Sequence, residues 1–247
     1  MISDAELYNI LTNDPEASKC LEDNNFGRLY NHIIKKYDYI SPNELTSFLL
    51  NAGLDVAENG SLPTAAYMGD KTLKTHDFSG NKSIGRFAFK ETGLTAVDLR
   101  GVEEIGQGAF FKSDIEDVTL KPGCKIGAGA FALTNIEVLY IPDGCYIGEV
   151  AFAGCNKLTT VVLDGTHIEF GSQEPFEYCR HINTVYFPME IESTAIGKLL
   201  HNTNRDEKVE INVMVTPSSP LNEEEILNSI KYYTSLSINN ITIREAE

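Results

Sequence analysis

A six-residue block, Ile-Gly-x-x-Ala-Phe, recurs every 21 residues in the middle of the chain. Its copies begin at Ile84, Ile105, Ile126 and Ile147, and a looser copy follows at Phe170 and Gly171 with Phe176. One such unit cannot bury its apolar side alone, whereas stacked copies share a continuous core. The period therefore predicts a solenoid whose successive turns lie on one another. Within each turn, we expect the glycine to permit a close backbone approach and the phenylalanine to fill space.

Each block is followed by two apolar residues that stand two positions apart. These pairs are Val97 and Leu99, Val118 and Leu120, Leu139 and Ile141, Val161 and Leu163, and Val185 and Phe187; counting by the period adds His76 and Phe78 before them, and Val209 and Ile211 after them. Alternation with period two is typical of a short strand with one buried face. We expect seven such strands, stacked in parallel as a ladder.

The fullest copy, Ile147 to Leu163, reads Ile-Gly-x-x-Ala-Phe-x-x-Cys-x-x-Leu-x-x-Val-x-Leu. This pattern resembles the BspA-type leucine-rich repeat, and the resemblance extends over about residues 72–213. It implies a curved bacterial solenoid that binds other proteins, often at a cell surface. It implies no catalysis.

The segments on either side of the repeats have a different composition. Ser3 with Glu6 is typical of a capping box, and apolar residues at helical spacing follow Asp14-Pro15, run from Phe26 to Ile34, and follow Ser41-Pro42. We interpret residues 1–53 as a helical domain, 54–71 as a linker or irregular first turn, and 72–215 as the solenoid. Residues 216–247 form a helix–strand cap that completes a β-α-β unit, which gives an α+β fold overall.

The chain is strongly acidic and has no obvious membrane or export signal. Thirty-six Asp and Glu against 20 Lys and Arg give a net charge of −16, which argues against nucleic acid as the partner. No run approaches the ~18 apolar residues that a membrane span requires, so membrane insertion is not expected. The sequence as written predicts a cytoplasmic protein, or a secreted or surface protein if a signal peptide has been removed.

Neither a cofactor site nor a metal site is predicted. The Gly-x-Gly segments at Gly106 and Gly127 are explained by the repeat, and the five histidines lack metal-ligand spacing. Repeat-related cysteines face each other as Cys124 with Cys145 and as Cys155 with Cys179. We favour buried free thiols over disulfides, because side chains stacked in parallel seldom point correctly for a bridge.

The outward residues of the strands are the candidate binding site. They place Tyr140, Tyr186, Val162 and Val138 in one patch, flanked by Asp77, Asp98, Asp117 and Glu210. An aromatic centre with a charged rim is typical of a protein-binding hot spot. Such residues also suit any exposed sheet, and a neighbouring segment could cover them.

Three functions remain open from the sequence. The first is a non-enzymatic module that binds a protein partner through the strand ladder. The alternative is an acidic inhibitor or decoy, for example one encoded by a phage or mobile element, that blocks a basic surface of a host enzyme. The third is an enzyme whose site includes His76, Asp77 and Asp98.

Overall fold

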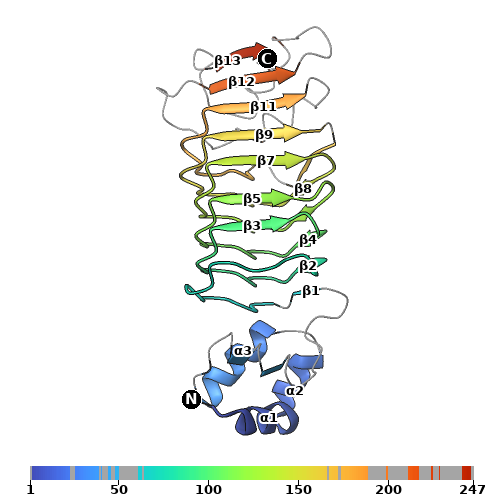
Figure 1. Cartoon of the computed structure of the whole chain (residues 1–247), viewed down its shortest axis with the longest axis vertical. Coiled ribbons are helices and arrows are strands. Elements are labelled where there is room, and N and C mark those ends of the chain that lie inside the picture. Colours follow the sequence, from blue (N-terminus) through green and yellow to red (C-terminus); the bar gives the residue numbers. More distant parts are fainter. Residues whose placement is uncertain are drawn as a thin grey trace.

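The fold is α+β, with N-terminal helices followed by a solenoid of parallel strands (Figure 1). The computed structural model describes residues 2–22, 26–38, 40, 44–45, 48–49, 61–62, 64–165, 167–171, 174–188, 199, 211–216, 224, 228 and 241–245. Two separate hydrophobic cores form, one among the helices and one inside the solenoid.

Three helices form the first part of the chain: α1 (Asp4–Asn13), α2 (Pro15–Glu22) and α3 (Phe26–Lys36). The predicted capping box of α1 is present, because Ser3 accepts a hydrogen bond from the Glu6 N–H and the Glu6 carboxylate accepts one from the Ser3 N–H. Residues 44–45 and 48–49 are helical where a fourth helix was expected, with Leu45 and Leu49 buried. Ser41 and Pro42 lie outside the described residues.

Asp14 joins α2 to α3. One carboxylate oxygen caps α2 by accepting hydrogen bonds from backbone N–H groups of its first turn. The other oxygen lies 2.9 Å from His32 Nε2, 2.7 Å from Lys36 Nζ and 2.5 Å from Tyr37 Oη. Burial by itself raises the pKa of Asp14, but the hydrogen bonds from Lys36, Tyr37 and His32 outweigh burial and hold this pKa well below its ordinary value.

The repeated isoleucines form the first of two strand ladders. It consists of two-residue parallel strands, in the order β1 (Ser61–Leu62), β2 (Ser83–Ile84), β4 (Glu104–Ile105), β6 (Lys125–Ile126), β8 (Tyr146–Ile147) and β10 (Glu169–Phe170). Leu62 pairs with Ile84, so regular pairing starts inside the segment interpreted from the sequence as a linker or irregular first turn. Ala66 and Tyr67 there take the places of Ala88 and Phe89 in the next turn.

The second ladder holds the longer strands. Its parallel members are β3 (Ala96–Leu99), β5 (Asp117–Leu120), β7 (Val138–Pro142), β9 (Thr160–Asp164), β11 (Thr184–Pro188), β12 (Ile211–Thr216) and β13 (Ile241–Glu245). β3 pairs with β5 in a two-stranded sheet, and β7, β9, β11, β12 and β13 pair in chain order in a separate five-stranded sheet. Glu224 and Asn228, between β12 and β13, are helical.

Two predicted rungs of this ladder are wrong. Residues 74–78 form no strand, although Phe78 is buried. In β12 the residue that pairs with Val185 is Val213, not Val209. An alternating sequence keeps the same residues on the same face when it shifts by an even number of positions, so alternation alone could not fix this register.

A column of phenylalanines fills the solenoid. Phe89, Phe110, Phe131, Phe152 and Phe176 are fully buried and stack with ring centroids 5.0–5.4 Å apart. Beside them runs a column of buried residues three positions further along the chain: Thr92, Ser113, Thr134, Cys155 and Cys179. Each of these side chains donates a hydrogen bond to a backbone carbonyl of a phenylalanine in this column, which satisfies its polar atom.

Candidate protein-binding surfaces

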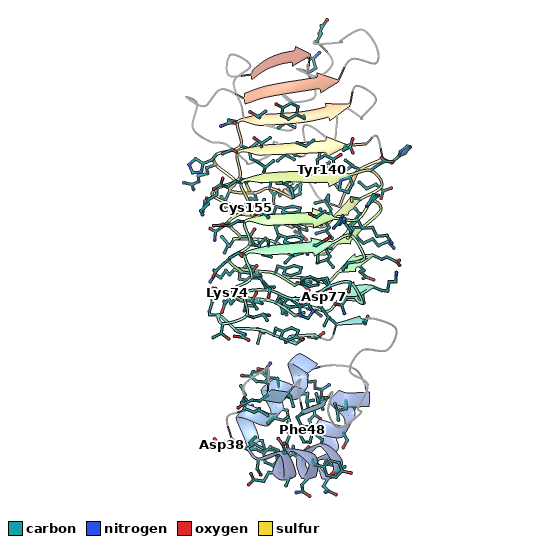
Figure 2. All side chains as sticks on the ribbon, viewed as in Figure 1. Asp38, Phe48, Lys74, Asp77, Tyr140 and Cys155 are labelled. Atoms are coloured by element: carbon teal, nitrogen blue, oxygen red, sulfur yellow. The ribbon has the colours of Figure 1, made fainter. Side chains whose placement is uncertain are left out.

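Four of the predicted residues lie together on the outer face of the second ladder. Tyr140 on β7 is the register partner of Val162 on β9, which is the partner of Tyr186 on β11. Val138 lies two residues before Tyr140 on the same face and is 57% exposed, while Tyr140 is 47% exposed. Figure 2 labels Tyr140 among the strands of the second ladder. Val162 and Tyr186 are half-buried. We call these four residues the ladder patch.

The tyrosine at the centre of the ladder patch has its hydroxyl engaged. Tyr140 Oη donates a hydrogen bond to the carboxylate of Asp164, at the end of the neighbouring strand β9. This hydrogen bond, with a smaller effect of burial, raises the pKa of Tyr140 to about 12. The hydrogen bond holds the hydroxyl end of the side chain, while Tyr140 as a whole stays about half exposed.

Of the four acidic residues predicted around the ladder patch, the structure describes Asp77, Asp98 and Asp117. Asp98 and Asp117 are exposed on the neighbouring strands β3 and β5. Asp98 is paired with Arg100 at 2.5 Å, and this hydrogen bond lowers its pKa to about 2. Asp77 lies 21 residues, or one turn, before Asp98 and is nearer than Tyr140 to the β1 end (Figure 2). Its carboxylate accepts a hydrogen bond from the Ser79 N–H.

The register of the last strands differs from the one that placed Glu210 beside Tyr186. With Val213 opposite Val185, the register partner of Tyr186 is Met214. Glu210 itself lies outside the described residues. The shift by four positions follows from the longer connection between the last two repeats.

His76, proposed from the sequence as part of an enzyme site, lies in an aromatic cluster. Its ring centroid is 4.7–5.1 Å from those of Tyr67, Phe78 and Phe89. Burial lowers the pKa of His76. The side chain therefore packs at the first turn of the core, while Asp77 and Asp98 have the local partners described above.

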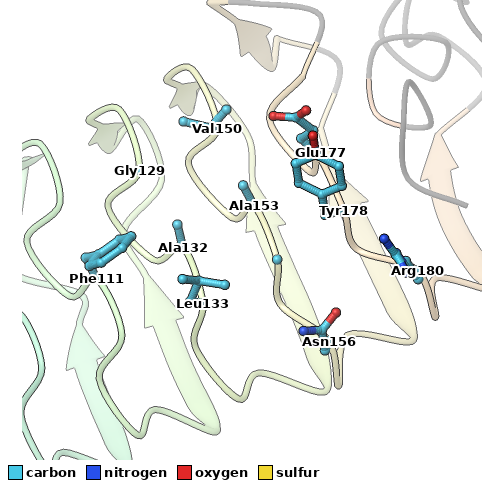
Figure 3. Close-up of a pocket in the computed structure, with 11 residues that line it drawn as sticks. Phe111, Gly129, Ala132, Leu133, Val150, Ala153, Asn156, Glu177, Tyr178 and Arg180 are labelled. Carbon is cyan, nitrogen blue, oxygen red and sulfur yellow. The ribbon is translucent and has the colours of Figure 1, made fainter.

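A second surface, which the sequence analysis missed, lies on the third side of the solenoid. An apolar groove of about 520 Å³ crosses the turns there (Figure 3). Its floor is made of small residues, including Gly129, Ala132 and Ala153, and Phe111 and Tyr178 stand at its two ends. Leu133 and Tyr178 are 43% and 47% exposed.

The repeat alignment contains a signal for this groove. The two positions after each stacked phenylalanine read Lys90-Glu91, Phe111-Lys112, Ala132-Leu133, Ala153-Gly154 and Glu177-Tyr178. At these two positions the first turn has charged residues, whereas the middle turns have small or apolar ones. The sequence does not show on which side of the solenoid these positions lie. The structure places them on one surface.

The five cysteines are buried free thiols in the structure. Burial raises the pKa of Cys124 to about 12. Within the described ranges, no three His, Cys, Asp or Glu side chains gather closely enough to hold a metal ion. None of the helices seen in the described part of the chain is long and apolar enough to cross a membrane.

Comparison with known proteins identifies the repeats. No match among curated proteins was found. A solved structure of a leucine-rich repeat protein from Bacteroides ovatus ATCC 8483 shares 12% sequence identity, with a TM-score of 0.21, over 76% of this chain and 82% of that chain. The model of the BspA type leucine rich repeat region matches residues 82–204 in six copies. Residues 82–204 of this chain therefore belong to the BspA-type leucine-rich repeat family.

Proposed function

We propose that this chain is a non-enzymatic interaction module that binds a protein partner through the ladder patch. A leucine-rich repeat solenoid is generally a protein-interaction scaffold. Its extended surface consists of columns of residues, and each turn contributes one residue to a column. The observation that supports this site is the exposure of Val138 and Tyr140, side by side with Val162 and Tyr186 on a paired sheet.

The energetics favour the ladder patch as a hot spot. A tyrosine buries a large area for few rotatable bonds, and it is enriched among residues that dominate binding energy. The strands beneath are hydrogen-bonded on both sides at β9, so binding would order little additional backbone. Asp117, exposed on β5 next to β7, favours a partner with a basic residue beside an apolar centre.

Affinity capture from a lysate of the source organism, with identification by mass spectrometry, tests this proposal. The variant is Val138→Asp with Tyr140→Thr, which places on β7 the residues that β5 has at the same repeat positions, Asp117 and Thr119. We expect a partner that the native chain retains and this variant loses. The control is Tyr146→Lys, which removes an exposed tyrosine from the first ladder and inserts the residue that Lys125 provides one turn earlier.

A partner captured equally by the native chain and by Val138→Asp/Tyr140→Thr would contradict the ladder-patch assignment. The proposal would also fail if Tyr146→Lys abolished capture to the same extent.

The net charge of −16 favours one second candidate, an acidic inhibitor or decoy that blocks a basic surface. Salt distinguishes the two functions. An electrostatic decoy loses affinity by orders of magnitude between about 50 and 300 mM salt, because screening shortens the range of its field. A complex held by the ladder patch loses much less over that interval.

A further inference from the structure

We infer that the partner segment on the ladder patch is extended and has the pattern Lys/Arg-x-apolar-x-Lys/Arg, with its two basic residues bound to Asp117 and Asp164. The inference rests on the proposed function, because it concerns the same surface and adds the chemistry of the partner. Both carboxylates are exposed, Asp117 on β5 and Asp164 on β9, the two strands that lie on either side of β7 and Tyr140.

The two carboxylates lie diagonally across the ladder patch. Asp164 pairs with Pro142, which is two residues after Tyr140 on β7. Asp117 has the repeat position of Val138, two residues before Tyr140, and lies one turn earlier on the adjacent strand β5. With strands about 4.8 Å apart and a rise of about 3.3 Å per residue, the two positions are roughly 16 Å apart, and Tyr140 is near their midpoint.

The free charges around the ladder patch are negative. The described Asp, Glu, Lys and Arg side chains on β5, β7, β9 and β11, or within three residues of these strands, are Asp114, Glu116, Asp117, Lys121, Glu137, Asp143, Lys157 and Asp164. Both lysines are already paired, Lys121 with Glu103 at 2.9 Å and Lys157 with Glu116 at 3.4 Å. Asp117, Glu137 and Asp164 have no cationic partner among the described residues, so this surface complements a basic segment.

The separation of the two carboxylates selects the spacing in the partner. In an extended segment, residues i, i+2 and i+4 point to the same side, and residues i and i+4 are about 13 Å apart. The long side chains of Lys and Arg extend this reach to carboxylates roughly 16 Å apart. In an α-helix the same two residues are only about 6 Å apart. The residue at i+2 of an extended segment then faces Tyr140, Val138 and Val162, so it must be apolar.

Tyr140 and Asp164 act together at one end of this arrangement. The Tyr140 hydroxyl donates a hydrogen bond to the Asp164 carboxylate, which keeps further lone pairs for a second donor. A basic side chain that binds Asp164 therefore lies beside the tyrosine ring, where a cation is also attracted by the ring face. The net charge of −16 acts in the same direction, because it attracts a basic segment and repels a second copy of this chain.

Selection of a displayed library of random heptapeptides on the full chain tests the inference. The test variant is Asp117→Asn/Asp164→Asn, which removes both charges and keeps an acceptor for the Tyr140 hydroxyl. The control is Glu104→Gln/Glu169→Gln, which changes the net charge equally at exposed positions of the first ladder. We expect enriched peptides with the pattern Lys/Arg-x-apolar-x-Lys/Arg. Their affinity should fall at least about fivefold for the test variant, the combined effect of two exposed ion pairs, and stay within twofold for the control.

Other results would overturn the inference, and Tyr140→Thr separates its failure from that of the proposed function. Peptides that bind Asp117→Asn/Asp164→Asn as tightly as the native chain but lose binding on Tyr140→Thr would refute the basic pattern and leave the ladder patch as the binding site. Peptides that bind all three proteins equally would contradict both proposals.

Two further outcomes count against the basic pattern alone. Basic peptides without a fixed spacing, weakened equally by the control variant, would show only the general field of an acidic chain. A selection that enriches no peptide would also overturn the inference, while capture from the lysate would still test the proposed function.

Discussion

The glycines after Ile105, Ile126 and Ile147 are required by space and not by backbone conformation. A Cβ on Gly127 would lie 2.8 Å from Gln107 N, Gly106 C and Ile105 O, all backbone atoms of the preceding turn. Because backbone atoms cannot rotate away, we expect Gly127→Ala to lower the free energy of unfolding by about 3 kcal/mol, the upper part of the range for overpacking. Urea unfolding monitored by circular dichroism measures this loss.

The control for this substitution is Gly129→Ala, two residues away. Gly129 has a φ of +61° and open space around its Cβ position, so only the left-handed conformation is penalised, by about 1 kcal/mol. If Gly127→Ala and Gly129→Ala lowered the free energy of unfolding equally, the close approach of adjacent turns would not be the reason for glycine at position 127.

Asp14 provides a pH-dependent prediction for the helices. Its hydrogen bonds from His32, Lys36 and Tyr37 hold its pKa below the ordinary value of 3.8. The unfolded chain then binds a proton before the folded chain does, so the stabilisation is complete above the ordinary pKa and is lost as pH falls through the lower folded pKa. We expect Asp14→Asn to destabilise the helices by about 1–3 kcal/mol near neutral pH.

Thermal unfolding of both proteins across pH, monitored by far-ultraviolet circular dichroism, checks this prediction. The difference between native chain and Asp14→Asn should be constant from about pH 8 to pH 5 and shrink below about pH 4. A difference that persists unchanged to the lowest pH would refute the role of the ionised carboxylate. Asp4→Asn, on the exposed side of α1, serves as the control.

At the scale of elements, the column of stacked phenylalanines stabilises the packing of one turn on the next. Phe131 stacks on rings 5.0 and 5.3 Å away on its two sides, whereas Tyr67, at the first turn, is half-buried and stacks on Phe89. Each ring pair contributes about 0.5–1.5 kcal/mol beyond the buried area. We expect Phe131→Leu to lower the free energy of unfolding by about 2 kcal/mol and Tyr67→Leu to lower it by about 1 kcal/mol, as measured by urea unfolding. A larger loss for Tyr67→Leu would contradict the stabilising role of the phenylalanine column.

The thiols within the same core should be unreactive. All five cysteines are buried. Burial raises the pKa of Cys124 to about 12, whereas a hydrogen bond with Cys179 lowers the pKa of Cys155, so restricted access to the buried sulfur atoms is what keeps the thiols unreactive. We expect a disulfide reagent to modify fewer than one thiol per native chain in minutes, and five after denaturation. The Lys112→Cys variant, with a cysteine at an exposed position, should have one additional thiol that reacts within minutes. Two or more thiols that react this fast in the native chain would contradict the burial of its cysteines.

The elements differ in how far the sequence predicts them. The 21-residue period predicts both the pairing of Ile105 with Ile126 and the strand around Val161, because identical units stack in register. The last rung differs, since Val213 replaces Val209 where the period is broken. The repeat pattern does not predict the turn at Ser61, because this turn has Leu62 and Tyr67 where the later turns have isoleucine and phenylalanine.

For the whole molecule, the sequence predicts one candidate surface better than the other. Strand residues alternate strictly, so the neighbourhood of Tyr140, Val162 and Tyr186 follows from counting. The groove lies on turns where left-handed residues such as Leu133 and Tyr178 change the direction of the chain. Counting along the sequence does not give the direction of their side chains, so that surface becomes visible only in the fold.

The most direct test of the central claim is the dissociation constant of the captured partner. It should be measured for the native chain, Val138→Asp/Tyr140→Thr and Tyr146→Lys at moderate salt. If the ladder patch is the binding site, the double variant weakens binding by at least about 30-fold, the effect of losing a hot spot, and Tyr146→Lys changes it less than twofold. Unchanged affinity of the double variant, or equal losses in both, would contradict the claim.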